Sequence, residues 1–435
     1  MANPYLPNWE YIPDGEPRVF GDRIYVYGSH DRKDSIDFCD YKLKVWSAPV
    51  SDPTKWVCHG DIFRSDGHDS PSDVDWTDEL LFAPDVVERG GKYYLYAYIV
   101  NAKGCVAVAD RPEGPFRLLS RYEYDIPNHY DNGTFIDPGV LVDDDGRVYI
   151  YCGYQGSYMC ELKDNMYEAV PGSYKLDIIP TAEPHRFFEA CSPRKINGTY
   201  YLIYSPQRGS CLDYATSDSP TGPFTYRGTI IDNGIDFPGG NDHGSVCCVN
   251  GQWYIFYHRM TNGTIMSRRG CVERIEILPD GTIPQVEMTS LGFEESLNPY
   301  DFTQADTACV LKGGCYITET SVFERPIVNV TDGCVMGWKY FDFGEDFASK
   351  TMQIRLKLRG TGSRGRVHVR LDSEDGEELG TVDFAEDSGT AGARIKAATG
   401  RHAVFLVAES GYEGWFAGGM KGRQLFMLDG FVIMK

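Results

Sequence analysis

Three carboxylic acids, Asp14, Asp137 and Glu189, precede short aromatic segments of the sequence at nearly equal distances. Asp85 and His243 occupy similar positions ahead of two further segments. Carboxyl groups that share one cleft can act as a general acid and a general base when their surroundings separate their pKa values. The pattern therefore indicates acid–base catalysis, provided that the fold brings these positions together.

The aromatic segments share one pattern, a turn with glycine followed by a strand of aromatic and aliphatic residues, which is typical of hairpins. The five copies lie at residues 20–31, 88–100, 143–154, 195–205 and 248–259. Aligned on one tyrosine each, they are separated by 68, 56, 51 and 54 residues, the size of a four-stranded propeller blade. We therefore predict an all-β protein with a five-bladed β-propeller over residues 1–295. The alternative is a β-sandwich with recurrent hairpins.

The innermost strand of each propeller blade lines the central axis, so residues just ahead of the hairpins can meet at one end of that axis. Asp14, Glu189 and His243 each lie 11 residues before their aligned tyrosine, and Asp137 lies 12 residues before its own because the turn is longer. Asp85, only 8 residues before its tyrosine, is expected at a different depth. We predict that the other four side chains share one cleft.

Local context separates the two catalytic roles. Glu189 follows two phenylalanines and precedes an alanine, and apolar surroundings favour a protonated carboxyl group, so Glu189 is the predicted acid. Asp14, in the segment PDGEP, is the predicted ionised base. Taken singly, Asp14 and Asp137 could be turn residues and His243 a core histidine, so the prediction depends on their common register. An acid, a base and many aromatics in one cleft suit a sugar substrate.

The overall composition limits the partners. The chain has 435 residues, and 63 acidic against 42 basic side chains give a net charge of −21, which argues against nucleic acid and anionic membranes. No apolar run is long enough to cross a bilayer. The start of the sequence has no signal-peptide pattern, so we expect a cytoplasmic protein unless a signal has been removed. The 29 tyrosines and 47 glycines favour strands and turns.

These segments resemble glycoside hydrolase family 43, a family of inverting enzymes with five-bladed propellers. The resemblance rests on DGEPRVFGDRIYVYGSHD, FIDPGVLVDDDGRVYIY and FFEACSPRKINGTYYLIYS. It implies that Asp14 is the general base that activates water, that Glu189 is the general acid, and that Asp137 orients the acid and tunes its pKa. Oligosaccharides or polysaccharides are the implied substrates.

Further motifs of the family imply residues around the site. Phe82 in FAPDV, Asp31 in GSHD and Arg268 in SRRGCVERIEI are expected to contact the substrate. His243 in GGNDHGSV is expected on the axis, where many members hold a calcium ion or its water shell. The implied chemistry itself requires no cofactor.

The resemblance implies an exo-acting enzyme that removes terminal α-L-arabinofuranosyl or β-D-xylosyl units from plant hemicellulose or pectin oligosaccharides. Residues 32–80, which include Trp46, Trp56 and Trp76, are numerous enough to close one side of the cleft and favour exo action. The alternatives are an endo-arabinanase or galactan-active enzyme of the same family, and a non-catalytic propeller that binds carbohydrate.

Residues 301–435 lack the hairpin repeat and show short alternating strands, which predict a smaller β-sandwich. This part resembles carbohydrate-binding module family 6, although Met427 stands where such modules often have asparagine. Trp338 and Trp415 are the aromatic residues expected to bind sugar. The alternative is an accessory domain that packs against the propeller and forms a wall of its active site.

Overall fold

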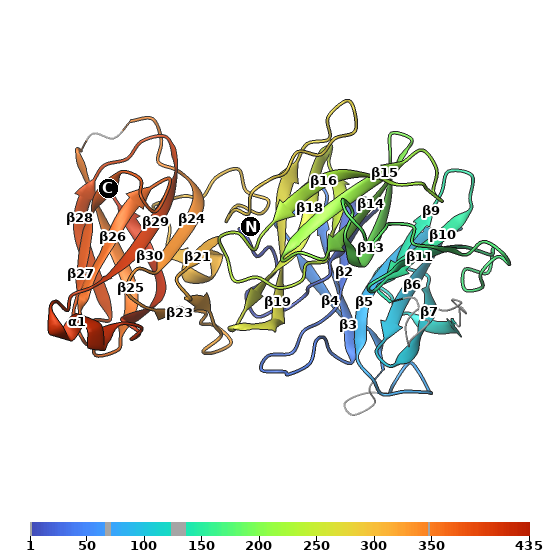
Figure 1. Cartoon of the computed structure of the whole chain (residues 1–435), viewed down its shortest axis with the longest axis horizontal. Coiled ribbons are helices and arrows are strands. Elements are labelled where there is room, and N and C mark those ends of the chain that lie inside the picture. The colour runs from blue at the N-terminus through green and yellow to red at the C-terminus, as the bar shows by residue number, and fades with distance from the viewer. Residues whose placement is uncertain (1, 66–70, 123–135, 347–348) are drawn as a thin grey trace.

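The computed structural model describes residues 2–65, 71–122, 136–346 and 349–435. Five sheets between Glu16 and Ile275 form the blades of a propeller, on the right of Figure 1, and two sheets between Thr303 and Met434 form a sandwich, on the left. The predicted fold class is therefore confirmed. The domain limits 1–295 and 301–435 stay predictions. In the described residues no helix is long and apolar enough to cross a membrane.

Four of the propeller sheets have four antiparallel strands each, and the fifth has three. The strands are β1 (Glu16–Phe20), β2 (Arg23–Gly28), β3 (Lys42–Pro49), β4 (Val57–Arg64), β5 (Leu81–Arg89), β6 (Lys92–Ile99), β7 (Ala102–Ala109), β8 (Arg117–Arg121), β9 (Gly139–Val142), β10 (Val148–Gly153), β11 (Ser157–Leu162), β12 (Lys175–Leu176), β13 (Phe187–Ile196), β14 (Thr199–Pro206), β15 (Cys211–Ser217), β16 (Thr225–Asp232), β17 (Ser245–Val249), β18 (Gln252–Thr261) and β19 (Thr264–Ile275). The predicted hairpins are the pairs β1–β2, β5–β6, β9–β10, β13–β14 and β17–β18.

Buried ion pairs join the innermost strands of different blades. Arg18 on β1 binds Asp85 on β5 through two hydrogen bonds, Nε–Oδ1 of 3.0 Å and Nη2–Oδ2 of 2.6 Å, and it also donates to the carbonyl of Val140 on β9. Arg194 on β13 binds Glu16 on β1 at 2.8 Å. Asp85 is buried and connects blades through Arg18 and through the amide of Val140, which donates to its Oδ2 at 2.7 Å.

The sandwich consists of a six-stranded and a five-stranded sheet. Its elements are β20 (Thr303–Gln304), η1 (Ala305–Thr307), β21 (Val310–Lys312), β22 (Tyr316–Ile317), β23 (Ile327–Val330), β24 (Val335–Asp342), β25 (Thr351–Gly360), β26 (Gly365–Leu371), β27 (Glu378–Phe384), β28 (Thr390–Lys396), β29 (Arg401–Ser410), α1 (Trp415–Met420) and β30 (Phe426–Met434). The larger sheet runs β22-β23-β30-β25-β28 with β20 beside β30, and the smaller runs β21-β24-β29-β26-β27. The last strand, β30, is thus an interior strand.

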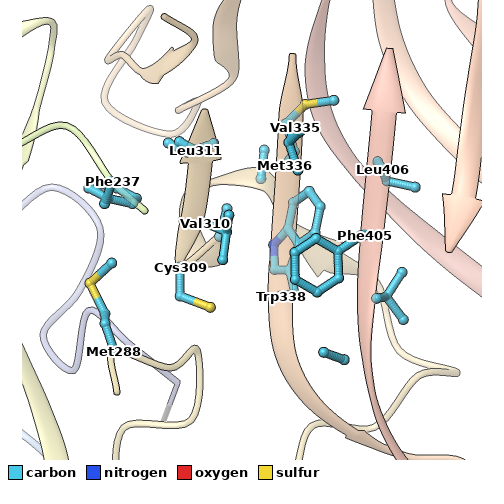
Figure 2. Close-up of a cluster of buried hydrophobic side chains, with 14 of the residues drawn as sticks. Phe237, Met288, Cys309, Val310, Leu311, Val335, Met336, Trp338, Phe405 and Leu406 are labelled. Atoms are coloured by element: carbon cyan, nitrogen blue, oxygen red, sulfur yellow. The ribbon is translucent and has the colours of Figure 1, made fainter. Parts of the chain in front are cut away.

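One apolar core continues from the propeller into the sandwich. Phe237 and Met288 of the propeller side belong to the same buried cluster as Cys309, Val310 and Trp338 of the sandwich (Figure 2). Trp338 is 0% exposed, and its Nε1 donates to the carbonyl of Gln304 at 3.2 Å. The expectation that Trp338 binds sugar is therefore wrong, because the side chain is a core residue of the sandwich.

Candidate active site

A cavity of about 290 Å³ lies at the end of the axis where the innermost strands of several blades begin. The described residues that line it are Asp14, Phe38, Cys39, Phe82, Tyr98, Val100, Ile136, Asp137, Tyr154, Glu189, Asn241, His243 and Arg268. Six of the seven predicted site residues are among them, and Asp31 is the exception. The structure thus brings together side chains that are more than 200 positions apart in the sequence.

Unusual backbone conformations direct the three carboxyl groups into the cavity. Asp14, two residues before β1, has a φ of 56°, and Asp137, two residues before β9, has a φ of 49°. Positive φ is rare for residues other than glycine and often marks functional positions. Glu189 lies on β13 between two register irregularities, and the following Ala190 has a φ of 63°. Such bulges change the direction of a side chain on a strand.

Asp14 is held as a carboxylate by its partners. Arg268 Nη1 donates to Oδ1 at 2.8 Å, Ser29 Oγ donates to Oδ2 at 2.6 Å, and His258 Nδ1 lies 3.4 Å from Oδ1. Burial raises the pKa of Asp14, but the Arg268 guanidinium, together with the hydrogen bond from Ser29, lowers it below its usual value. Asp14 is therefore ionised at neutral pH, as a general base must be.

Arg268 is fixed between two carboxylates and an aromatic ring. Its Nε and Nη2 bind the two oxygens of Asp31 at 2.9 Å each, and its guanidinium lies 4.8 Å from the ring centroid of Phe38. Asp31 is 1% exposed, and it also accepts a hydrogen bond from the amide of Cys39. The expectation that Asp31 contacts the substrate is not met, because its carboxylate lies behind Arg268 and orients that side chain toward Asp14.

Glu189 and Asp137 differ from Asp14 in that their surroundings raise their pKa values. Burial and Asp14 raise the pKa of Glu189 to about 7, against a lowering hydrogen bond from Asn241 Nδ2 to Oε1 of 2.7 Å. Burial, Glu189 and Asp14 raise the pKa of Asp137 well above its usual value. Like charges in a buried site cannot all ionise together, so this pair retains a proton near neutral pH. One cavity thus contains an ionised carboxylate and a protonated carboxyl group.

His243 lies beside the base, with Nδ1 3.9 Å from Asp14 Oδ1. Burial lowers the pKa of its ring, which is therefore neutral at neutral pH. Calcium takes about six to eight oxygen ligands, whereas the described residues contain no group of three or more His, Cys, Asp or Glu side chains suited to a metal ion. These side chains alone do not match a calcium site, so calcium beside His243 stays a prediction.

A second, larger cavity of about 930 Å³ adjoins the first. Its lining includes Gln155, Phe188, Arg208 and Ser210, and it shares Asn241 with the smaller cavity. Gln155 directly follows Tyr154 in the sequence, and Phe188 directly precedes Glu189. The two cavities therefore form neighbouring parts of one depression. This arrangement provides a small compartment beside a roomier one.

Several residues of the site were not predicted. Phe38, Tyr98 and Tyr154 line the cavity, but they belong to a protein with 29 tyrosines and 22 phenylalanines, so residue type alone did not mark them. Asn241 stands two residues before His243, at an offset from the hairpin that the register does not mark. Within residues 32–80, the described lining residues are Phe38 and Cys39, and Trp46 instead donates to Glu10 at 3.0 Å.

Comparison with known proteins places this site in a family. Residues 18–283, more than half of the chain, match the family model of glycosyl hydrolases family 43. The chain belongs to glycosyl hydrolases family 43. A xylosidase/arabinosidase of Thermoclostridium stercorarium is 38% identical, and the match covers 93% of this chain and 95% of the relative. A β-xylosidase of Xylanibacter ruminicola is 31% identical over 66% of this chain and 100% of its own length.

Solved structures of the family show the same architecture. The GH43_1 enzyme of Xanthomonas citri, solved with xylotriose, matches at a TM-score of 0.56 and 27% identity, covering 66% of this chain and 94% of that protein. An arabinoxylan arabinofuranohydrolase of Bacillus subtilis matches at a TM-score of 0.55 over 100% of this chain and 97% of its own. At 24% identity this second likeness shows the fold alone, but it extends over the sandwich as well as the propeller.

Proposed function

We propose that the protein is an inverting, exo-acting glycosidase that removes terminal α-L-arabinofuranosyl or β-D-xylosyl residues from plant hemicellulose or pectin oligosaccharides. The observation that carries the proposal is one small cavity in which Asp14 is ionised while Glu189 and Asp137 retain a proton. The relatives named xylosidase/arabinosidase and β-xylosidase support the choice of sugars.

The proposed reaction is a single displacement. Glu189 gives its proton to the glycosidic oxygen as the bond to the anomeric carbon breaks, and the remaining saccharide leaves as an alcohol. A water molecule forms the new bond to the anomeric carbon from the opposite face while Asp14 accepts its proton, so the configuration inverts. Asp137 supports the acid, as the family resemblance implies. Burial and Glu189 raise the pKa of Asp137, so this carboxyl group holds its proton beside the acid.

The cavity dimensions support exo action. A volume of about 290 Å³ is at the small end of ligand pockets and suits one terminal sugar, with Phe82 and Tyr98 in the wall. The cavity of about 930 Å³ beyond Asn241 offers room for the leaving saccharide. An endo-acting enzyme would instead need an open groove on both sides of the three carboxyl groups.

A panel of nitrophenyl α-L-arabinofuranoside, β-D-xyloside and galactoside, run beside branched and debranched arabinan, tests the proposal. We expect hydrolysis of one or both pentosides, free pentose as the first product, and an inverted anomer in the first minutes of an NMR time course. A retained anomer would contradict the role of Asp14. Oligosaccharides as the first products from debranched arabinan would favour the endo-arabinanase, and inertness on every substrate would favour a non-catalytic carbohydrate-binding protein.

The sandwich is proposed to bind polysaccharide through α1, in keeping with its resemblance to carbohydrate-binding module family 6. Trp415 and Phe416 on this helix are 88% and 65% exposed, and exposed aromatic surface often marks a binding site. Trp415→Ala should therefore weaken retention on insoluble arabinoxylan, whereas the same change at the exposed Phe323 (81%) should not. Equal retention of both variants and the wild type would leave α1 without this role.

A further inference from the structure

Asn241 lies at the boundary between the two cavities. Among the described residues it alone lines both the cavity of about 290 Å³ and the cavity of about 930 Å³. In the proposed function the terminal sugar fills the first cavity and the leaving saccharide extends toward the second. The glycosidic oxygen between them must therefore lie close to Asn241, on the same side of the site as Glu189.

The side chain of Asn241 contacts the acid directly. Its Nδ2 donates to Glu189 Oε1 over 2.7 Å, and an oxygen that faces an N–H donor is not the one that carries the acidic proton. The proton of Glu189 is thus assigned to Oε2. A hydrogen bond to a carboxylate is stronger than one to a neutral carboxyl group, so the contact strengthens as Glu189 gives up its proton. Asn241 therefore stabilises the state that the acid reaches in the transition state.

The backbone of Asn241 is in turn held by His258, a buried residue on β18. His258 Nε2 lies 2.9 Å from the carbonyl of Asn241, and Nδ1 accepts a hydrogen bond from the amide of Asp14 at 3.3 Å. Burial lowers the pKa of His258 to about 3, so the ring is neutral and has a single N–H. The two contacts place that proton on Nε2. The neutral ring of His258 thus holds the backbone of Asp14, the proposed base, and the backbone of Asn241, which contacts the proposed acid.

We infer that Asn241, held by His258, is a positioning residue that keeps Glu189 Oε1 as an acceptor and leaves proton donation to Oε2. The inference rests on the proposed role of Glu189 as the general acid. It assigns Asn241 a part in proton transfer to the leaving group and no part in the activation of water by Asp14.

The test compares Asn241→Ala and Asn241→Asp with the wild type and with Asn298→Ala, a control on the segment between the propeller and the sandwich. For each protein, kcat/KM is measured against pH on a dinitrophenyl and a methyl glycoside of the pentose that the substrate panel identifies. The methyl glycoside needs its leaving oxygen protonated, whereas dinitrophenolate leaves without that help. Among the described residues, the exposed side chain of Asn298 forms hydrogen bonds within its own turn, with Asp301 and Tyr300.

We expect Asn241→Ala to lower kcat/KM on the methyl glycoside by on the order of tenfold, with less than about threefold loss on the dinitrophenyl glycoside. The alkaline limb of the profile should move to higher pH in Asn241→Ala because the donor is lost. It should move further in Asn241→Asp, because a second negative charge then opposes ionisation of Glu189. Asn298→Ala should leave the limb unmoved.

Equal losses on both substrates, or an unmoved alkaline limb in both Asn241 variants, would overturn the inference. Glu189→Gln, assayed in parallel, separates this outcome from failure of the proposed function. If Glu189→Gln retains activity on the methyl glycoside, the assignment of the acid is wrong. If Glu189→Gln is inactive there but the Asn241 variants show no preference between leaving groups, only the inference fails.

His258 is tested through its hydrogen bond. His258→Gln retains an amide N–H that can replace the donor Nε2–H, so its alkaline limb should stay at the wild-type position. His258→Leu removes the donor and should move the limb as Asn241→Ala does. The same limb position in both folded His258 variants would contradict the role given to His258. If neither variant folds, the Asn241 series still decides the role of Asn241.

Discussion

Glu189→Gln should make the protein more stable at alkaline pH although it removes the proposed acid. Burial raises the pKa of Glu189 from 4.5 to about 7, so the folded protein binds this proton more tightly than the unfolded chain does. Stability is lost as the pH rises from about 4.5 to about 7, because the unfolded chain releases the proton first. At about 1.4 kcal/mol for each tenfold change in proton affinity, the loss reaches about 3 kcal/mol.

This figure is an upper limit, because the Glu189 side chain is partly exposed. Glutamine has nearly the shape of protonated glutamate and never ionises, so the variant avoids the loss. Its Oε1 can still accept the hydrogen bond from Asn241. Glu189 also raises the pKa of Asp137, so removing the charge at position 189 makes Asp137 easier to ionise. This effect too stabilises the variant at alkaline pH.

The measurement is thermal unfolding of the wild type and Glu189→Gln, at pH 4.5 and at pH 8. We expect the two proteins to have nearly equal midpoints at pH 4.5 and the variant to have a midpoint several degrees higher at pH 8. Glu276→Gln, on an exposed residue, is the matched control and should show no such difference. A gain that is the same at both pH values, or a variant that is less stable at pH 8, would refute the account of a buried charge.

Three further outcomes follow from the same site. The wild-type kcat/KM should fall above about pH 7, because Glu189 must be protonated. On the acid side it should fall only below the usual titration range of an aspartate, because the pKa of Asp14 is lowered. A pH profile on an aryl pentoside measures both limbs. Asp14→Asn should lower kcat by about 10²–10⁴-fold with unchanged circular dichroism, and near-normal turnover would exclude Asp14 as the base. Arg268→Lys should lower kcat/KM by about 100-fold and move the acid limb to higher pH. A single lysine ammonium group cannot form both hydrogen bonds to Asp31 and also reach Asp14. An unmoved acid limb would contradict the role given to Arg268.

The register of the repeat was sufficient to predict which acids meet. The hairpin spacing alone places Asp14, Asp137, Glu189 and His243 at one end of the axis, because blades related by rotation put equivalent positions at equal depth. The offset of Asp85 likewise predicted its exclusion from that group. Register does not reveal hydrogen-bond partners, however. Whether a buried acid such as Asp31 faces a substrate or a neighbouring arginine depends on side-chain directions that sequence spacing leaves open.

Trp338 and Asn241 show two other limits of sequence reasoning. In an alternating strand the period of two does not say which face is buried, so Trp338 could have faced either solvent or the core. Asn241 depends on the contact between the segment before β17 and the bulge in β13, which only the folded propeller creates. Calcium near His243 and a cytoplasmic location stay predictions.

The shared core and the position of β30 also matter during synthesis. The propeller side of the core, with Phe237 and Met288, is complete before the sandwich strands leave the ribosome. The residues from Thr303 onward need roughly 7–27 s to be made at about 5–20 residues per second. Because β30 is an interior strand of the larger sheet, that sheet cannot be completed earlier. A newly made propeller therefore carries an uncovered apolar face throughout this interval, which is the period in which it is most exposed to aggregation and to capture by chaperones.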